Sequence, residues 1–207
     1  MENHRFRLGP YTRLQYLNGG GMLASRGFSL IEVLVAMSLS SILMIGTMRL
    51  LPSLQRAVLQ QSQLNLMRED VWQLAFSIAK QAQRAGYCHG ECPGKGMEIL
   101  DDGHCLIVQW DANHNGKWDG ATTSEPEQTG YRLREKNIEI QRGATQCTGK
   151  GWERLTDPAQ FRIDDFTVAK IDRAGQKPLI TISLSAAMAQ DPTRSLNVLQ
   201  QIVGYNQ

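Results

Sequence analysis

The first informative pattern in the chain is a long apolar stretch near its N-terminus. Residues Phe28 to Leu51 contain one acidic residue, Glu32, and 16 uncharged residues run from Val33 to Met48. As an α-helix, Phe28 to Leu51 would be roughly 36 Å long, which is enough to cross the hydrocarbon core of a bilayer. We therefore predict a membrane-spanning helix over residues 28–51.

Helical periodicity continues beyond this span. Between Leu64 and Ala82, apolar side chains recur at three- and four-residue spacing, while the charged residues lie mostly on other faces. Pro52 stands where the apolar stretch ends, and Gly86 stands where a helix is expected to stop. The pattern predicts one helix over about residues 28–85, apolar all round in its first half and amphipathic over residues 52–85.

From residue 86 the pattern changes to short segments separated by Gly, Asn and Pro. Between residues 179 and 185, aliphatic side chains alternate with Thr181, Ser183 and Ser185, which predicts a strand with one buried and one wet face. The predicted strands are Met97–Leu100, Cys105–Trp110, Gly130–Glu135, Asn137–Arg142, Phe161–Asp172, Leu179–Ala187 and Leu196–Val203. A long N-terminal helix packed on an antiparallel β-sheet is an α+β fold, with about 120 residues for one modest core.

The charges are divided unevenly along the chain. Four arginines precede the apolar span, so the positive-inside rule predicts a cytoplasmic N-terminus and a periplasmic C-terminal part. With Glu2 they give residues 1–27 a charge of +3, and subtracting this from the chain's +2 leaves −1 for residues 28–207. A broad basic field is therefore missing, and we expect no nucleic-acid partner.

Glu32 needs a partner. An ionised carboxylate at hydrocarbon depth costs several kcal/mol, and no Lys or Arg lies one helical turn from Glu32. If the chain is cut after Gly27, the new α-amine of Phe28 is a cation in the same membrane layer as the Glu32 of a neighbouring subunit. Such pairing is a mechanism for assembly.

Residues 26–32, Arg-Gly-Phe-Ser-Leu-Ile-Glu, resemble the signal of type IV prepilins and type II secretion pseudopilins. The segments 83–92 and 108–119 look like those of the prepilin peptidase-dependent protein B family of minor pilins. The resemblance implies cleavage by prepilin peptidase between Gly27 and Phe28, N-methylation of Phe28 and a pilin-like fold. It also implies the inner membrane as location, and other pilins and minor pilins as partners.

This interpretation divides the chain into four parts. They are a leader peptide (1–27), the transmembrane half of the helix (28–51), its amphipathic half (52–85) and a periplasmic β-rich domain (86–207). Residues 1–21 lack apolar periodicity, and a start at Met22 would give the usual short leader, so 1–21 is a candidate start-site misassignment. A plain membrane anchor and a secretory signal peptide are the alternatives, although a signal peptide is cut after its apolar region and not before it.

All four cysteines follow the span. An even count in an oxidising compartment predicts two disulfides among Cys88, Cys92, Cys105 and Cys147, and the sequence leaves three pairings open. A zinc site is the alternative, but its spacing matches no standard pair of Cys-x-x-Cys motifs. Its ligands would be Cys88, His89, Cys92, His104 and Cys105.

Residues 111–119 resemble a calcium loop in their spacing. Oxygen ligands would come from Asp111, Asn113, Asn115, Asp119 and the carbonyl of Lys117, with Gly116 at the sharp turn. The bidentate Glu expected at the twelfth position is missing, and Thr122 stands there. We therefore expect weak calcium binding if any and no required cofactor, with a plain Asn-Gly turn as the alternative.

Catalytic motifs are missing from the sequence. No Ser, His and acid grouping has a nucleophile-elbow context, and no Gly-rich phosphate loop follows a strand, so we expect no enzyme. The predicted function is a minor pilin that takes part in assembly or priming of a type IV pilus or a related pseudopilus. A type II secretion pseudopilin, or a fibre-tip module that binds DNA, a surface or cargo, is the alternative.

Overall fold

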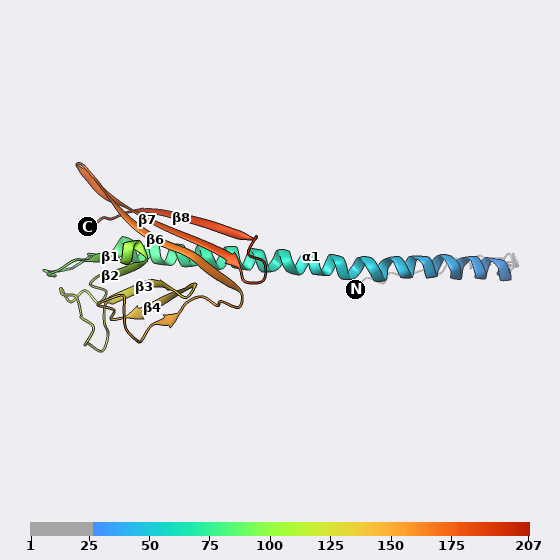
Figure 1. Ribbon diagram of the computed structural model, residues 1–207, viewed down its shortest axis with the longest axis horizontal. Coiled ribbons are helices and arrows are strands. Elements are labelled where there is room, and N and C mark those ends of the chain that lie inside the picture. The colour runs from blue at the N-terminus through green and yellow to red at the C-terminus, as the bar shows by residue number, and fades with distance from the viewer. Residues whose placement is uncertain (1–26) are drawn as a thin grey trace, which may run out of the picture. The chain divides into compact units, whose positions relative to one another are not determined.

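The computed structural model describes residues 27–207 (Figure 1). Residues 1–26 of the predicted leader, including Met22 and the four arginines before the span, lie outside the described residues. Helix α1 (Leu30–Arg84) is followed by eight strands and a short 3-10 helix, η1 (Asp101–Gly103). The predicted helix is confirmed, with each end within two residues of its expected position.

Contacts divide the chain at Pro52 into two units, each described by itself. In the first unit, every described residue is exposed, including the aliphatic side chains of α1 up to Leu51. This part of α1 is long and apolar enough to cross a membrane, by length and composition. An exposed helix that is predominantly apolar on all faces is unfavourable in water, so this segment requires lipid or protein around it.

In the second unit, residues 53–207, α1 buries one face. The buried side chains recur at three- and four-residue spacing, as predicted, and half of them are alanines, which let strands approach the helix closely. They are Met67, Val71, Ala75, Ile78, Ala79 and Ala82. These residues form one hydrophobic cluster with side chains from both sheets.

The first sheet contains five strands in chain order, all antiparallel. Its strands are β1 (Met97–Leu100), β2 (Cys105–Gln109), β3 (Gln128–Arg134), β4 (Asn137–Arg142) and β5 (Glu153–Arg154). Strands β3 and β4 are joined by Glu135 and Lys136, whose φ values of 50° and 65° are those of a tight two-residue hairpin turn. The pattern missed β5, because two exposed residues carry no periodicity.

The second sheet contains three antiparallel strands, β6 (Phe161–Arg173), β7 (Gln176–Met188) and β8 (Ser195–Val203), in that order. The predicted alternation in β7 is confirmed: Ile180, Ile182 and Leu184 are fully buried, while Thr181 and Ser183 lie partly exposed on the other face. The α+β prediction is confirmed, and the strands divide into two sheets, which the pattern alone did not specify.

Candidate functional site

The first candidate site is the start of α1, where the fold holds Glu32 by a local contact. The Ser29 N–H donates to Glu32 Oε2 (3.1 Å), and the Ser29 carbonyl accepts from the Val33 N–H (3.2 Å). Ser29 is therefore the N-cap and Glu32 the third helical residue, which is one half of a capping box. This role was not predicted from the sequence, although Ser-x-x-Glu before an apolar run is its signal.

Glu32 has no basic partner among residues 27–207. No Lys, Arg or His side chain in this range forms an ion pair with it. Phe28 directly precedes the N-cap Ser29, and it is 83% exposed. The described start of α1 thus leaves one carboxylate oxygen of Glu32 and the Phe28 side chain open to a neighbour.

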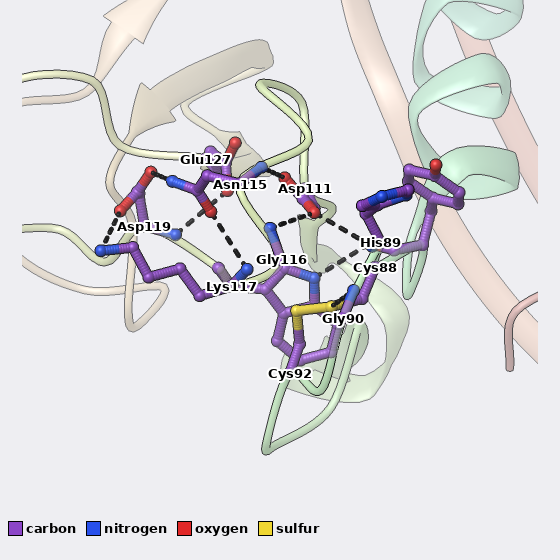
Figure 2. Close-up of a disulfide and its surroundings, with 12 residues drawn as sticks. Cys88, His89, Gly90, Cys92, Asp111, Asn115, Gly116, Lys117, Asp119 and Glu127 are labelled. Carbon is purple, nitrogen blue, oxygen red and sulfur yellow. Dashed lines mark hydrogen bonds and ion pairs between the residues drawn. A yellow bond between two sulfur atoms is a disulfide. The ribbon is translucent and has the colours of Figure 1, made fainter.

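The second candidate site is at the end of α1, where Figure 2 shows a disulfide beside the loop 111–119. Cys88 is bonded to Cys92, and Cys105 of β2 is bonded to Cys147. The prediction of two disulfides is confirmed, and one of the three open pairings is selected. The zinc alternative is wrong, because all four sulfurs are used in disulfides and no group of three His, Cys, Asp or Glu side chains in the described range is placed to hold a metal.

Asp111 organises the loop. Its side chain is buried, and its carboxylate accepts three backbone N–H groups: His89 (3.0 Å), Gly116 (3.0 Å) and Asn115 (2.9 Å) (Figure 2). The Asp111 N–H in turn donates to the Tyr87 carbonyl (2.9 Å). Asp111 therefore joins the loop to the segment that follows α1, next to the Cys88–Cys92 disulfide.

Backbone donors also set the charge of Asp111. Burial on its own raises the pKa of the carboxyl group. The three N–H groups, with the backbone of His89 the strongest of them, favour the charged form, and the net pKa is lowered below the ordinary value of 3.8. Asp111 is thus a charged structural anchor.

Glu127, just before β3, supplies a second carboxylate that the spacing did not reveal. It is buried, and it accepts the N–H groups of Ala112 (2.7 Å), Asn113 (3.2 Å) and Asp119 (3.0 Å). Thr122, at the position expected for a calcium ligand, is exposed. Glu127, five positions after Thr122, thus supplies the carboxylate that faces the loop. Its spacing from Asp111 fits no fixed calcium-loop motif.

The loop side chains satisfy one another. Asn113 Nδ2 and Asn115 Nδ2 both donate to Asp119 Oδ2 (2.9 and 2.8 Å), and Lys117 Nζ lies 3.9 Å from Asp119 Oδ1. The two asparagine oxygens accept the N–H groups of Asn115 and Lys117. This is the geometry of consecutive turns around Gly116, whose φ is +82°.

Calcium binding would require a rearrangement of this loop. A cation beside Asp119 would meet amide nitrogens, which are not ligands, unless both asparagine side chains rotated to present their oxygens. The five residues predicted as ligands are brought together, but as a hydrogen-bonded turn. Calcium binding therefore stays a prediction.

Comparisons with known proteins identify the family of the chain. The family model described as prepilin peptidase-dependent protein B matches residues 58–204. The chain belongs to this family. A second model, the prokaryotic N-terminal methylation motif, matches residues 22–48 and so includes Glu32 and the start of α1.

One curated relative covers nearly the whole chain. It is the prepilin peptidase-dependent protein B of Escherichia coli (strain K12), 45% identical over 181 residues, which is 87% of this chain and 97% of the relative. No solved structure matches the chain. The matched segments confirm the resemblance drawn from residues 26–32, 83–92 and 108–119.

The Asp111 anchor predicts a pH-dependent loss of stability. Asp111→Asn replaces an acceptor by an amide donor facing three N–H groups, so we expect the melting temperature near neutral pH to fall by about 5 °C or more. The pKa of Asp111 is lower in the folded state than the ordinary value of 3.8. The charged carboxylate therefore stabilises the fold fully above about pH 3.8, and this stabilisation is lost as the pH falls through the folded-state pKa. The difference between variant and parent should therefore narrow below about pH 4 in thermal unfolding.

Asp172→Asn is the matched control, because the Asp172 side chain is 85% exposed. It should leave the melting temperature unchanged at every pH. An Asp111→Asn difference that stays constant between neutral pH and about pH 3 would contradict the anchor role.

Thermal unfolding also tests the prediction of calcium binding. If calcium binds the folded chain with a dissociation constant near 10⁻³ to 10⁻⁴ M, about 5 mM CaCl₂ should raise the melting temperature by several degrees. Asp119→Asn should remove this increment, since Asp119 supplies the least buried carboxylate of the loop. An unchanged melting temperature in calcium, relative to EDTA, would leave the loop as a turn only.

Proposed function

We propose that this chain is a minor pilin that takes part in assembly or priming of a type IV pilus or a related pseudopilus. Prepilin peptidase cuts it between Gly27 and Phe28, and the new N-terminus is methylated. The observation that carries the proposal is Glu32, an acidic residue on an exposed apolar helix that has no basic partner within residues 27–207. The methylation motif over residues 22–48 supports it.

Cleavage supplies the missing partner. The Ser29 N–H occupies only one oxygen of Glu32, so the other can accept a charged donor. A free α-amine at Phe28 of a neighbouring subunit is such a donor, because it lies only four residues before Glu32 and therefore in the same membrane layer. The pairing neutralises two charges in the apolar layer and orders one subunit against the next.

The same proposal fixes the topology. The chain spans the inner membrane once through the first half of α1, with its N-terminus in the cytoplasm and residues 53–207 in the periplasm. Two disulfides support an oxidising location for this second unit. The relative in Escherichia coli is named for its dependence on prepilin peptidase, which supports that enzyme as the processing partner.

A structural role fits the described residues better than a catalytic one. The buried carboxylates Asp111 and Glu127 are used by backbone N–H groups, and in residues 27–207 no cluster is placed to hold a metal. A pseudopilin of a type II secretion system would share all these features. A fibre-tip binding module is the second alternative, and the charge of −1 after residue 27 disfavours DNA as its ligand.

The cleavage site is tested by mass. Protein isolated from cells with an active prepilin peptidase should begin at Phe28 and carry one methyl group on its α-amine. Protein from cells that lack the peptidase should keep Gly27 and the residues before it. Intact-mass spectrometry separates the two, and a chain from peptidase-positive cells that still carries its leader would refute the proposal.

The role of Glu32 is tested by two variants that separate charge from capping. Glu32→Gln keeps an oxygen for the Ser29 N–H but removes the charge, whereas Glu32→Ala removes both. We expect both variants to remain in the membrane and both to lose most cross-linking to other pilins, by about 10-fold or more. Normal cross-linking of Glu32→Gln would mean that Glu32 acts only as a helix cap.

A further inference from the structure

Strand β8 has an open edge. It pairs with β7 on one side only, and among residues 27–207 no other strand pairs with it. The β7–β8 register is regular from Ala187↔Ser195 to Leu179↔Val203, without a bulge. The second sheet therefore ends in a straight strand of nine residues.

The ladder fixes which backbone groups face outward. Gly204 N–H donates to the Pro178 carbonyl, and Met188 N–H donates to the Arg194 carbonyl (both 3.0 Å), at the two ends of the β7–β8 ladder. In an antiparallel pair these bonded positions recur every second residue, so the even-numbered residues of β8 bond to β7. The N–H and C=O groups that point away belong to Ser195, Asn197, Leu199, Gln201 and Val203.

The other strand edges are protected. Strand β1 has four residues and β5 has two, both of them charged. Strand β6 has two register shifts, and the first sheet covers part of its edge, since Ile163 N–H donates to the Lys136 carbonyl (2.9 Å) and the His104 ring lies 2.7 Å from the Phe166 carbonyl. Short length, charge, bulges and cover are the usual means of blocking edge pairing.

Strand β8 has none of these protections. Residues 195–207 contain no charged residue and no proline. Leu199, at the centre of the strand, is 56% exposed, between Asn197 and Gln201, which are also exposed. The adjacent outer face of β7 adds Thr181, Ser183 and Ser185, so the surface around the centre of the edge is apolar or neutral. The nearest charges in the chain before β8, Arg194 and Asp191, pair with each other, so a charged strand would find no free counter-ion at the centre.

We infer that the β8 edge receives an extended, uncharged strand from a different subunit of the fibre, added by backbone hydrogen bonds to Asn197, Leu199 and Gln201. The inference rests on the proposed function for the presence of such a subunit. Strand addition of this kind gives affinity through the backbone and specificity through alternate side chains.

A second copy of this chain does not fit this edge. Self-pairing of β8 about a two-fold axis would be antiparallel. In Figure 1, β8 runs along the second half of α1, so the two copies of this helical segment would then point in opposite directions. Subunits anchored in one membrane and assembled into one fibre point the same way.

Hydrogen exchange provides the test. The full chain is purified in detergent, both alone and in the complex that it forms with co-expressed minor pilins. In the chain alone, the amides of Leu199 and Gln201 should exchange quickly; in the complex they should exchange about 100-fold more slowly. The amides of Val198 and Gln200, which bond to β7, should be protected in both samples and serve as the internal control.

Each outcome separates the two proposals. An intact complex in which Leu199 exchanges as fast as in the chain alone overturns this inference and leaves the proposed function standing. The absence of any complex overturns both. Protection of Leu199 in the purified chain, together with a dimer by analytical ultracentrifugation, would assign the edge to a second copy and overturn the inference.

Two variants separate backbone from side chain. Leu199→Pro removes an outward N–H that β7 does not use, and proline is tolerated at such an edge position, so the fold should persist while recovery of the complex falls at least about 10-fold. Leu199→Thr keeps the N–H and should retain the complex. Equal recovery with both variants would overturn backbone pairing, and the exchange experiment decides independently if the proline variant fails to fold.

Discussion

The fold of residues 53–207 depends on the burial of one face of α1. Val71, Ala75 and Ile78 are fully buried in a cluster that also contains strands of both sheets. The two sheets do not pair with each other through a continuous ladder, so they are joined by this shared apolar contact and by a few polar contacts, such as the Ile163 N–H with the Lys136 carbonyl. The end of α1 also contacts the first sheet closely. Gly86 N–H donates to the Gln109 carbonyl (2.9 Å), and a side chain on Gly96 would overlap the backbone of Gly86.

The hydrogen bond between Gly86 and Gln109 also positions the loop 111–119. The Tyr87 carbonyl, one residue beyond Gly86, accepts from both the Asp111 N–H (2.9 Å) and Trp118 Nε1 (3.0 Å). The Cys88–Cys92 disulfide then closes the segment that Asp111 holds. The region that most resembles a metal loop in sequence is therefore part of the structural join between helix and sheet, and its carboxylates are needed there.

Sequence patterns predicted the elements better than the contacts between them. The periodicity of residues 64–82 and the alternation in residues 179–185 gave the helix and β7 nearly to their ends, because both patterns report local burial. Disulfide pairing could not be predicted, since Cys105 and Cys147 meet only after β2, β3 and β4 have paired. Glu127 was missed for the same reason. The hydrogen bond from the Ser29 N–H to the Glu32 carboxylate could have been predicted, since its motif is local.

The order of the strands along the chain has a consequence for folding. Val71 on the helix shares its core with Ile182 of β7 and Val198 of β8, which are separated from it by roughly 100 residues or more of chain. Until the last strands are available, the apolar face of α1 in this unit lacks the second sheet, which supplies much of its shared core. The core therefore closes late, and a chain interrupted before β8 would present a partly uncovered helix face to chaperones and proteases.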